Sequence, residues 1–207
     1  MKTIALAFFL LVPIALGGTN SAAALTPDET TLLYNSYGAE SKGDLDGALS
    51  HALGVLRTQP DDYLVNFRLG WLFSRVKKFK NAIDHYGAAA KASPESVEPW
   101  LALSLLHLHL GNYQQTLGAG TALLKRDPKN YHGLLRTSTA QQVLKMHADA
   151  LATTDEALML YPLDTLFLER KGYLLRELGR TLESDQVLRR LLLVSPRNAY
   201  ANSVLKK

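Results

Sequence analysis

Among the side chains that most often bind metal ions or transfer protons, this 207-residue chain has histidines and carboxylates but no cysteine. The histidines are His51, His85, His107, His109, His132 and His147. His107 and His109 are two residues apart, which places them on different faces of a helix, and no other two lie three or four residues apart. We therefore expect no metal ion. A site assembled between segments, for instance from His109 and His132, is the alternative that the spacing leaves open.

Motifs of the common catalytic and cofactor-binding classes are also missing. The sequence contains no H-E-x-x-H, G-x-S-x-G, P-loop or dinucleotide-binding glycine pattern. Asp44 and Asp46, like Asp61 and Asp62, have the spacing of loop and capping acids, with no sign of a shared enclosed pocket. We expect a protein that is not an enzyme and holds no cofactor.

The charge of the chain argues against a nucleic-acid partner. The net charge is +4, and residues 1–24 contain Lys2 and no acid, so 22 basic and 19 acidic residues remain beyond them, a net of +3. The basic residues are dispersed, whereas nucleic-acid surfaces show clustered Lys and Arg.

The organisation of the chain follows from five prolines spaced 34 residues apart: Pro60, Pro94, Pro128, Pro162 and Pro196. A fixed period of this size is typical of stacked helical units. In this register the units are 29–62, 63–96, 97–130, 131–164 and 165–198. The last residue of each unit, and the residue before the first, is of a type that caps helix N-termini: Asp28, Asp62, Ser96, Asn130, Asp164 and Asn198. We expect a helix to begin directly after each.

Each unit is also expected to break near its middle into two helices. Gly43, Gly111 and Gly179 share one column of the repeat, where a left-handed residue would end the first helix; Lys77 and Lys145 fill this column in the other two units. Two further columns contain small residues, which let paired helices approach closely. They are Ser36, Gly70, Ser104, Ser138 and Gly172, and Ala48, Ala82, Thr116, Ala150 and Ser184.

These columns resemble the tetratricopeptide repeat, a helix-turn-helix unit of the same length. The second unit matches through Leu69, Gly70, Phe73, Phe79, Ala82, Ile83, Tyr86, Ala89 and Pro94, and the third through Trp100, Leu103, Gly111, Tyr113 and Pro128. Gly120 and Thr154 depart from the usual aromatic residue of the second helix. The resemblance covers residues 29–198 and implies an all-α, right-handed α-solenoid of five helix-turn-helix repeats. Residues 199–207 are expected to form a short C-terminal capping helix, which completes a domain of residues 25–207.

The first 24 residues have the composition of a secretory signal peptide. Lys2 precedes an apolar run over residues 3–17, and the small residues Ala22–Ala24 offer a cleavage site. The run has about 15 residues against the roughly 20 that a membrane-spanning helix needs. We expect a periplasmic or secreted protein with no stable membrane span after cleavage. A retained anchor, or a eukaryotic secretory route, is the alternative.

The resemblance also implies where a partner binds, since such arrays hold extended or helical peptide segments on the concave side formed by the first helices. The expected partner-binding groove comprises Leu33, Tyr37, Leu64, Phe67, Arg68, Trp71, Arg75, Leu101, Leu105, Leu108, Arg136, Arg170 and Tyr173. In the third unit, Leu101, Leu105 and Leu108 are expected to line the groove, whereas Leu103, Leu106 and Leu110 face the core. Burial of the former against neighbouring units is the alternative.

The column of Arg68, Arg136 and Arg170 suggests an arginine edge, because arginine pairs bidentately with carboxylates. The lysine and asparagine positions of the family's best-known carboxylate clamp are instead apolar here. We therefore expect a protein–protein interaction scaffold or adaptor, serving assembly of a cell-envelope complex. The alternative is a structural protein, a homo-oligomer that associates with itself through the leucine-rich third unit.

Overall fold

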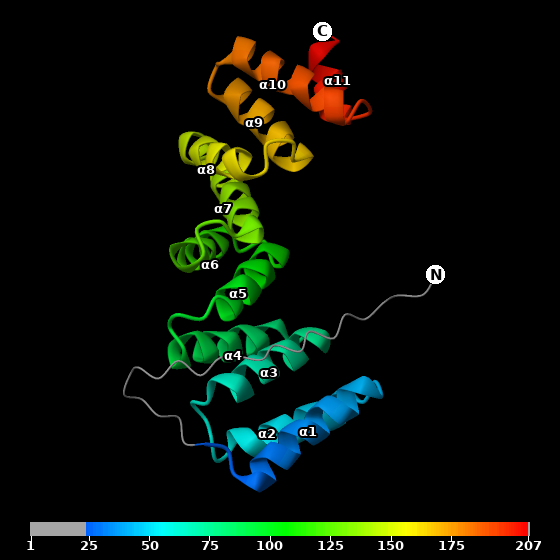
Figure 1. Ribbon diagram of the computed structural model, residues 1–207, viewed down its shortest axis with the longest axis vertical. Helices are drawn as coiled ribbons and strands as arrows, with labels where there is room; N and C mark the ends of the chain where they lie inside the picture. The colour runs from blue at the N-terminus through cyan, green and yellow to red at the C-terminus, as the bar shows by residue number, and fades with distance from the viewer. Residues whose placement is uncertain (1–23, 207) are drawn as a thin grey trace.

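The computed structural model describes residues 24–206, which form eleven helices and no strand. The helices are α1 (Pro27–Ser41), α2 (Leu45–Leu56), α3 (Tyr63–Arg75), α4 (Phe79–Ala92), α5 (Glu98–His109), α6 (Tyr113–Arg126), α7 (Tyr131–Val143), α8 (His147–Leu160), α9 (Thr165–Glu177), α10 (Thr181–Val194) and α11 (Ala199–Leu205). Consecutive helices pair into hairpins that stack from α1 and α2 at one end to α11 at the other (Figure 1). The chain is therefore an all-α helical repeat array, as predicted. The signal-peptide prediction for residues 1–24 falls almost wholly outside the described residues.

Four of the six predicted caps are confirmed. Side-chain oxygens of Asp62, Asn130, Asp164 and Asn198 accept backbone N–H bonds in the first turns of α3, α7, α9 and α11. These bonds satisfy donors that have no partner within the helix.

The predictions for Asp28 and Ser96 are wrong. Helix α1 begins earlier because Thr26 and Glu29 form a capping box and Pro27 is favourable at the first helical position. Ser96 does not cap α5: the helix begins at Glu98 with Val97 at the N-cap position, and Pro99 lacks one of the two N–H groups that a Ser96 side chain could accept. The Ser96 hydroxyl instead pairs with that of Ser93 at 2.8 Å.

In all five mid-unit turns, the residue at the same position of the repeat adopts the left-handed backbone conformation. The φ angles are +82°, +73° and +75° at Gly43, Gly111 and Gly179, and +60° and +64° at Lys77 and Lys145. The two lysines thus adopt the conformation that glycine adopts elsewhere, at a steric cost that glycine avoids.

Replacing Lys77 or Lys145 with glycine is therefore expected to raise the free energy of unfolding by about 0.5–1 kcal/mol each. Urea unfolding followed by circular dichroism measures the change. Lys78→Gly is the matched control, because Lys78 has φ −85° and carries no left-handed strain for glycine to relieve. An equal response at positions 77 and 78 would show that the left-handed conformation costs nothing here.

The two small-residue columns bring the helices of each hairpin together, as predicted. The hydroxyl of Ser36 donates to the carbonyl of Ala48 at 2.8 Å, and that of Ser184 to the carbonyl of Gly172 at 2.7 Å. A Cβ on Gly70 would lie 2.6 Å from the Tyr86 ring, so only glycine fits without a shift. At Gly120, where the family has an aromatic residue, the Thr137 side chain of the next unit occupies the space.

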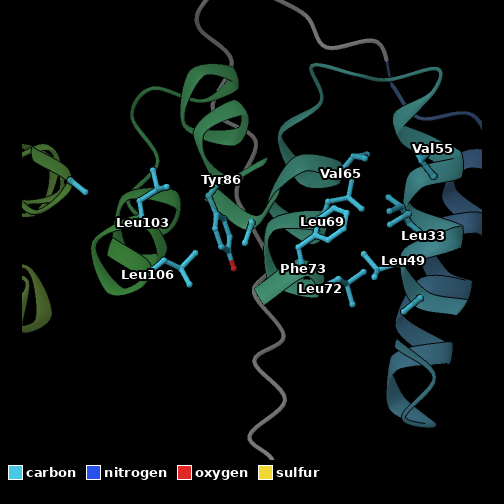
Figure 2. Packing of buried hydrophobic residues seen from close by; sticks show 14 residues of the cluster. Leu33, Leu49, Val55, Val65, Leu69, Leu72, Phe73, Tyr86, Leu103 and Leu106 are labelled. Atoms are coloured by element: carbon cyan, nitrogen blue, oxygen red, sulfur yellow. The ribbon is translucent and has the colours of Figure 1, made fainter. Parts of the chain in front are cut away.

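The apolar core runs between the units as well as within them. One cluster includes Leu33 and Val55 from the first hairpin, Leu69 from the second and Leu103 from the third, as Figure 2 shows. Because each hairpin buries its apolar side against the next, stability depends on neighbouring units. Among residues 24–206 no helix is both long and apolar enough to cross a membrane.

Candidate functional site: the first-helix face

The first helices of the five hairpins are held side by side by contacts between consecutive units. Arg68 of α3 donates to Ser36 of α1, Arg136 of α7 to Ser104 of α5, and Arg170 of α9 to Ser138 of α7. Between α3 and α5, the Tyr63 hydroxyl donates to Glu98 at 3.3 Å. We call the accessible side chains of α1, α3, α5, α7 and α9 the first-helix face.

An apolar and aromatic stripe remains accessible on this face. Tyr37, Leu64, Trp71 and Leu105 are 46%, 42%, 44% and 51% exposed. Of the other predicted groove residues, Arg75 is exposed and five are half-buried: Phe67, Leu101, Leu108, Arg170 and Tyr173. Phe67 also packs against Tyr86 in the core, with ring centroids 5.4 Å apart. Ten of the thirteen predicted residues are therefore exposed or half-buried, and Leu33, Arg68 and Arg136 are buried.

Glu40 organises the end of the stripe formed by α1 and α3. Its carboxylate accepts hydrogen bonds from Trp71 Nε1 at 2.7 Å and Arg75 Nη1 at 3.2 Å, and it pairs with Arg68. Burial alone would raise the pKa of Glu40, but the bonds from Trp71 and Arg68 and the two positive charges outweigh it and lower the pKa. Sequence reasoning missed Glu40, although it lies three residues after Tyr37, one turn along the same stripe.

The arginines stack on the aromatic rings of this network. The Arg68 guanidinium lies 3.9 Å from the centroid of the Tyr37 ring, and that of Arg75 lies 5.6 Å from the Trp71 ring. Cation–π contacts of this kind restrict the ring positions. Tyr37 and Trp71 are thus exposed yet held in place, so that a partner would lose little freedom in ordering them.

The prediction that Leu33 lines the groove is wrong. Its side chain is 5% exposed and belongs to the core cluster. Figure 2 shows Leu33 on the side of the first hairpin that faces Val65 and Leu69. The packing of α3 against the first hairpin covers this position, whereas Leu101 at the same place in the third unit is only half-buried.

The predicted arginine edge is also wrong, because the three arginines bond to the preceding unit instead of facing a partner. Arg136 is 8% exposed, and its Nη1 donates to the Leu101 carbonyl at 2.7 Å and to Ser104 Oγ at 3.0 Å. Arg170 donates to the Leu135 carbonyl at 3.0 Å, to Ser138 Oγ and to Gln142 Oε1. Burial lowers the pKa of Arg136, and lowers that of Arg170 to about 10.

These contacts define an Arg–Ser link that recurs along the array. Serine and arginine stand 32 residues apart in three pairs: Ser36 and Arg68, Ser104 and Arg136, and Ser138 and Arg170. Where the serine is replaced by Gly70, the arginine is replaced by Ala102. The sequence contained this signal, but it is visible only when columns of neighbouring units are compared.

The leucines of α5 divide between core and surface. Leu103 and Leu106 are 6% and 7% exposed, as predicted for the core. The prediction for Leu110 is wrong: it is 40% exposed, because α5 ends at His109 and Leu110 follows as its C-cap. Leu105 is exposed beside the half-buried Leu101 and Leu108, so α5 contributes to the first-helix face.

His107 of α5 supports a pH prediction. Burial lowers its pKa below the usual 6.5, and its buried Nδ1 has no partner among the described residues. The unfolded chain therefore binds a proton more readily, so the stability present above pH 6.5 is lost as the pH falls through the folded pKa. His107→Phe is expected to flatten the fall in unfolding free energy across this range. Urea unfolding at pH values on either side of 6.5 tests this, and an unchanged slope would refute it.

Nothing in the described part of the chain resembles a metal centre. His109 and His132 are exposed and contact Phe79 and Tyr131, with ring centroids 5.3 and 5.4 Å apart. Within residues 24–206, no three His, Cys, Asp or Glu side chains are grouped so as to hold a metal ion.

Comparison with known proteins agrees with this architecture. Residues 67–131 match the family model described as tetratricopeptide repeat. The comparison with curated proteins gives no match. The family match covers residues 67–131, and helical hairpins of the same kind continue on both sides of it.

Solved structures with the same fold cover most of the chain. MamA has a TM-score of 0.74 at 16% identity, over 83% of this chain and 94% of its own. YrrB, described as a TPR protein with an unusual peptide-binding site, has a TM-score of 0.76 at 14% identity, over 87% and 93%. A tetratricopeptide repeat protein from Parabacteroides merdae has a TM-score of 0.73 at 20% identity, over 86% and 71%. At these identities the likeness extends to the fold alone.

Proposed function

We propose that this protein is a scaffold or adaptor that binds an extended or helical segment of another protein on the first-helix face. The observation that supports this most strongly is the exposed stripe through Tyr37, Trp71 and Leu105, which three consecutive units contribute. Trp, Tyr and Arg residues dominate binding energy at protein interfaces. The peptide-binding site named for YrrB, which has the same fold, is consistent with such a role.

The chemistry of the stripe indicates what segment would fit. Arg68, Arg136 and Arg170 bond to the preceding unit and are buried or half-buried, whereas Arg75, which also bonds to Glu40, is exposed. The middle of the face is formed by Leu64, Leu101, Leu105 and Leu108. We infer that the partner segment presents apolar side chains to α3 and α5, with an acidic residue near Arg75.

We further propose that the protein is exported and acts in the assembly of a cell-envelope complex. The basis is the sequence of residues 1–24, with its short apolar run and the small residues Ala22–Ala24. N-terminal sequencing of the protein purified from its native host tests this. Cleavage near Ala22–Ala24 is the expected result, and an intact N-terminus would contradict it.

The binding proposal is tested by affinity purification under crosslinking from the native host. Leu105→Asp should reduce recovery of the partner by at least about tenfold, because it buries a charge in an apolar contact. Leu53→Asp on α2 is the matched control, since Leu53 is a 36% exposed leucine on a second helix. Equal recovery with both variants would exclude the first-helix face as the binding surface.

A further inference from the structure

The outer faces of α8 and α10 expose aliphatic side chains near the C-terminal ends of these helices. Met159 and Leu193 are 79% and 84% exposed, and Leu160 and Val194 next to them are 39% and 40% exposed. These values leave Met159 and Leu193 almost without packing partners. We call Met159, Leu160, Leu193 and Val194 the α8/α10 patch.

The repeat supplies an internal comparison for this patch. The position of Met159 and Leu193 is occupied in the first three units by Arg57, Lys91 and Lys125. The fold therefore does not require an apolar residue there. Large exposed apolar groups clustered on adjacent units mark a contact surface.

The charges one turn earlier are opposite on the two helices. Asp155 and Glu156 of α8 occupy the positions that Arg189 and Arg190 occupy on α10. Glu156, Arg189 and Arg190 are exposed. Asp155 contacts Lys171 at 2.7 Å, and Arg190 donates to the Pro162 carbonyl at 3.3 Å. The surface thus presents an acidic half and a basic half, each beside aliphatic residues.

The two halves are neighbours. Leu158 of α8 packs on the cluster that contains Leu188 and Leu191 of α10. The bond from Arg190 to Pro162 joins α10 to the end of the α8 hairpin. Both helices belong to the last two hairpins, adjacent in Figure 1, and as equivalent second helices of consecutive repeats they run in similar directions.

We propose that a second copy of this chain docks on the α8/α10 patch and forms a two-fold symmetric dimer. The two-fold axis lies above the surface between α8 and α10 and runs parallel to both helices. It places α8 of one copy over α10 of the other. Rotation about this axis leaves the position of each residue along the helix direction unchanged. Glu156 then faces Arg190 of the second copy, and Met159 faces Leu193 of the second copy, twice in each dimer. A partner of one charge sign would meet repulsion on one half, whereas a second copy is complementary to both.

Sedimentation of the purified protein as a function of concentration tests the dimer. The wild-type protein should pass from monomer to dimer on concentration up to roughly 0.2 mM, since weak dimers have micromolar dissociation constants. Glu156→Arg and Arg190→Glu should each weaken association by at least about tenfold, because both pairs become like-charged. Circular dichroism shows whether each variant keeps its helical content.

Two further samples make the test specific. The chain with both Glu156→Arg and Arg190→Glu, and an equal mixture of the two single variants, should dimerise again, because opposite charges face each other once more. Two control variants should leave the dimer dissociation constant unchanged. They are Lys125→Glu, at the repeat position that Met159 occupies one unit later, and Leu105→Asp on the first-helix face. The proposal is overturned if the wild-type protein stays monomeric, or if the charge reversals have no effect. A dimer lost only with Leu105→Asp would place self-association on the third unit instead. This inference does not depend on the proposed partner binding.

Discussion

Arg136→Ala is expected to lower the free energy of unfolding by about 3 kcal/mol. The substitution removes the hydrogen bonds to the Leu101 carbonyl and Ser104 Oγ and also removes a large side chain from between α5 and α7. Because Arg136 is 8% exposed, water cannot fully replace what is lost. Chemical unfolding monitored by circular dichroism measures the effect.

Ser104→Ala supplies the second arm of a double-mutant cycle. It should cost about 1–2 kcal/mol, since the guanidinium then loses one of its two acceptors. The double variant should be more stable than the sum of the two losses predicts, by about 1 kcal/mol. Gly70 and Ala102 occupy the equivalent positions of α3 and α5, where both groups are absent together. Strict additivity would mean that the Arg–Ser link contributes nothing as a pair.

Trp71→Ala is expected to weaken binding of the partner by about 30- to 100-fold, the range typical of a tryptophan at the centre of an interface. The indole is 44% exposed, and its Nε1 bond to Glu40 holds it in position, so its loss should affect binding more than folding. Isothermal titration with the identified partner segment gives the affinity, and thermal unfolding gives the stability.

Trp71→Phe distinguishes the contribution of the aromatic ring from that of its hydrogen bond to Glu40. It keeps an aromatic surface but loses the hydrogen bond to Glu40, so an intermediate affinity is expected. Leu53→Ala on α2 should leave the affinity unchanged. If Trp71→Ala binds as tightly as the wild-type protein, the Glu40 network is a structural feature of the array and not part of the binding surface.

The repeat period predicted most of the fold because packing between equivalent helices is local. Each hairpin meets only its neighbours, so a residue that is small or capping in one unit has the same role in the next. The N-cap predictions that were wrong are those where a neighbouring proline changed where the helix begins. Pro99 removed one of the two N–H groups that a Ser96 cap could accept, and Pro27 allowed α1 to begin before Asp28.

The site was predicted less well, for a physical reason that the arginines illustrate. The position of a residue in the repeat identifies the helix face to which its side chain is attached. An arginine side chain, however, is long enough to reach the preceding unit. Arg68, Arg136 and Arg170 share the predicted column, yet their guanidinium groups lie against Ser36, Ser104 and Ser138. Short side chains such as Leu64 and Leu105 stay where their column places them, and both are exposed.

Site-specific photocrosslinking in the native host tests the central claim most directly, that a partner binds on the first-helix face. A photoreactive side chain is placed in turn at Trp71, Leu105 and, as the control on a second helix, Leu53. The account predicts covalent adducts with the same partner protein from positions 71 and 105 and none from position 53. Adducts from position 53 alone would contradict it.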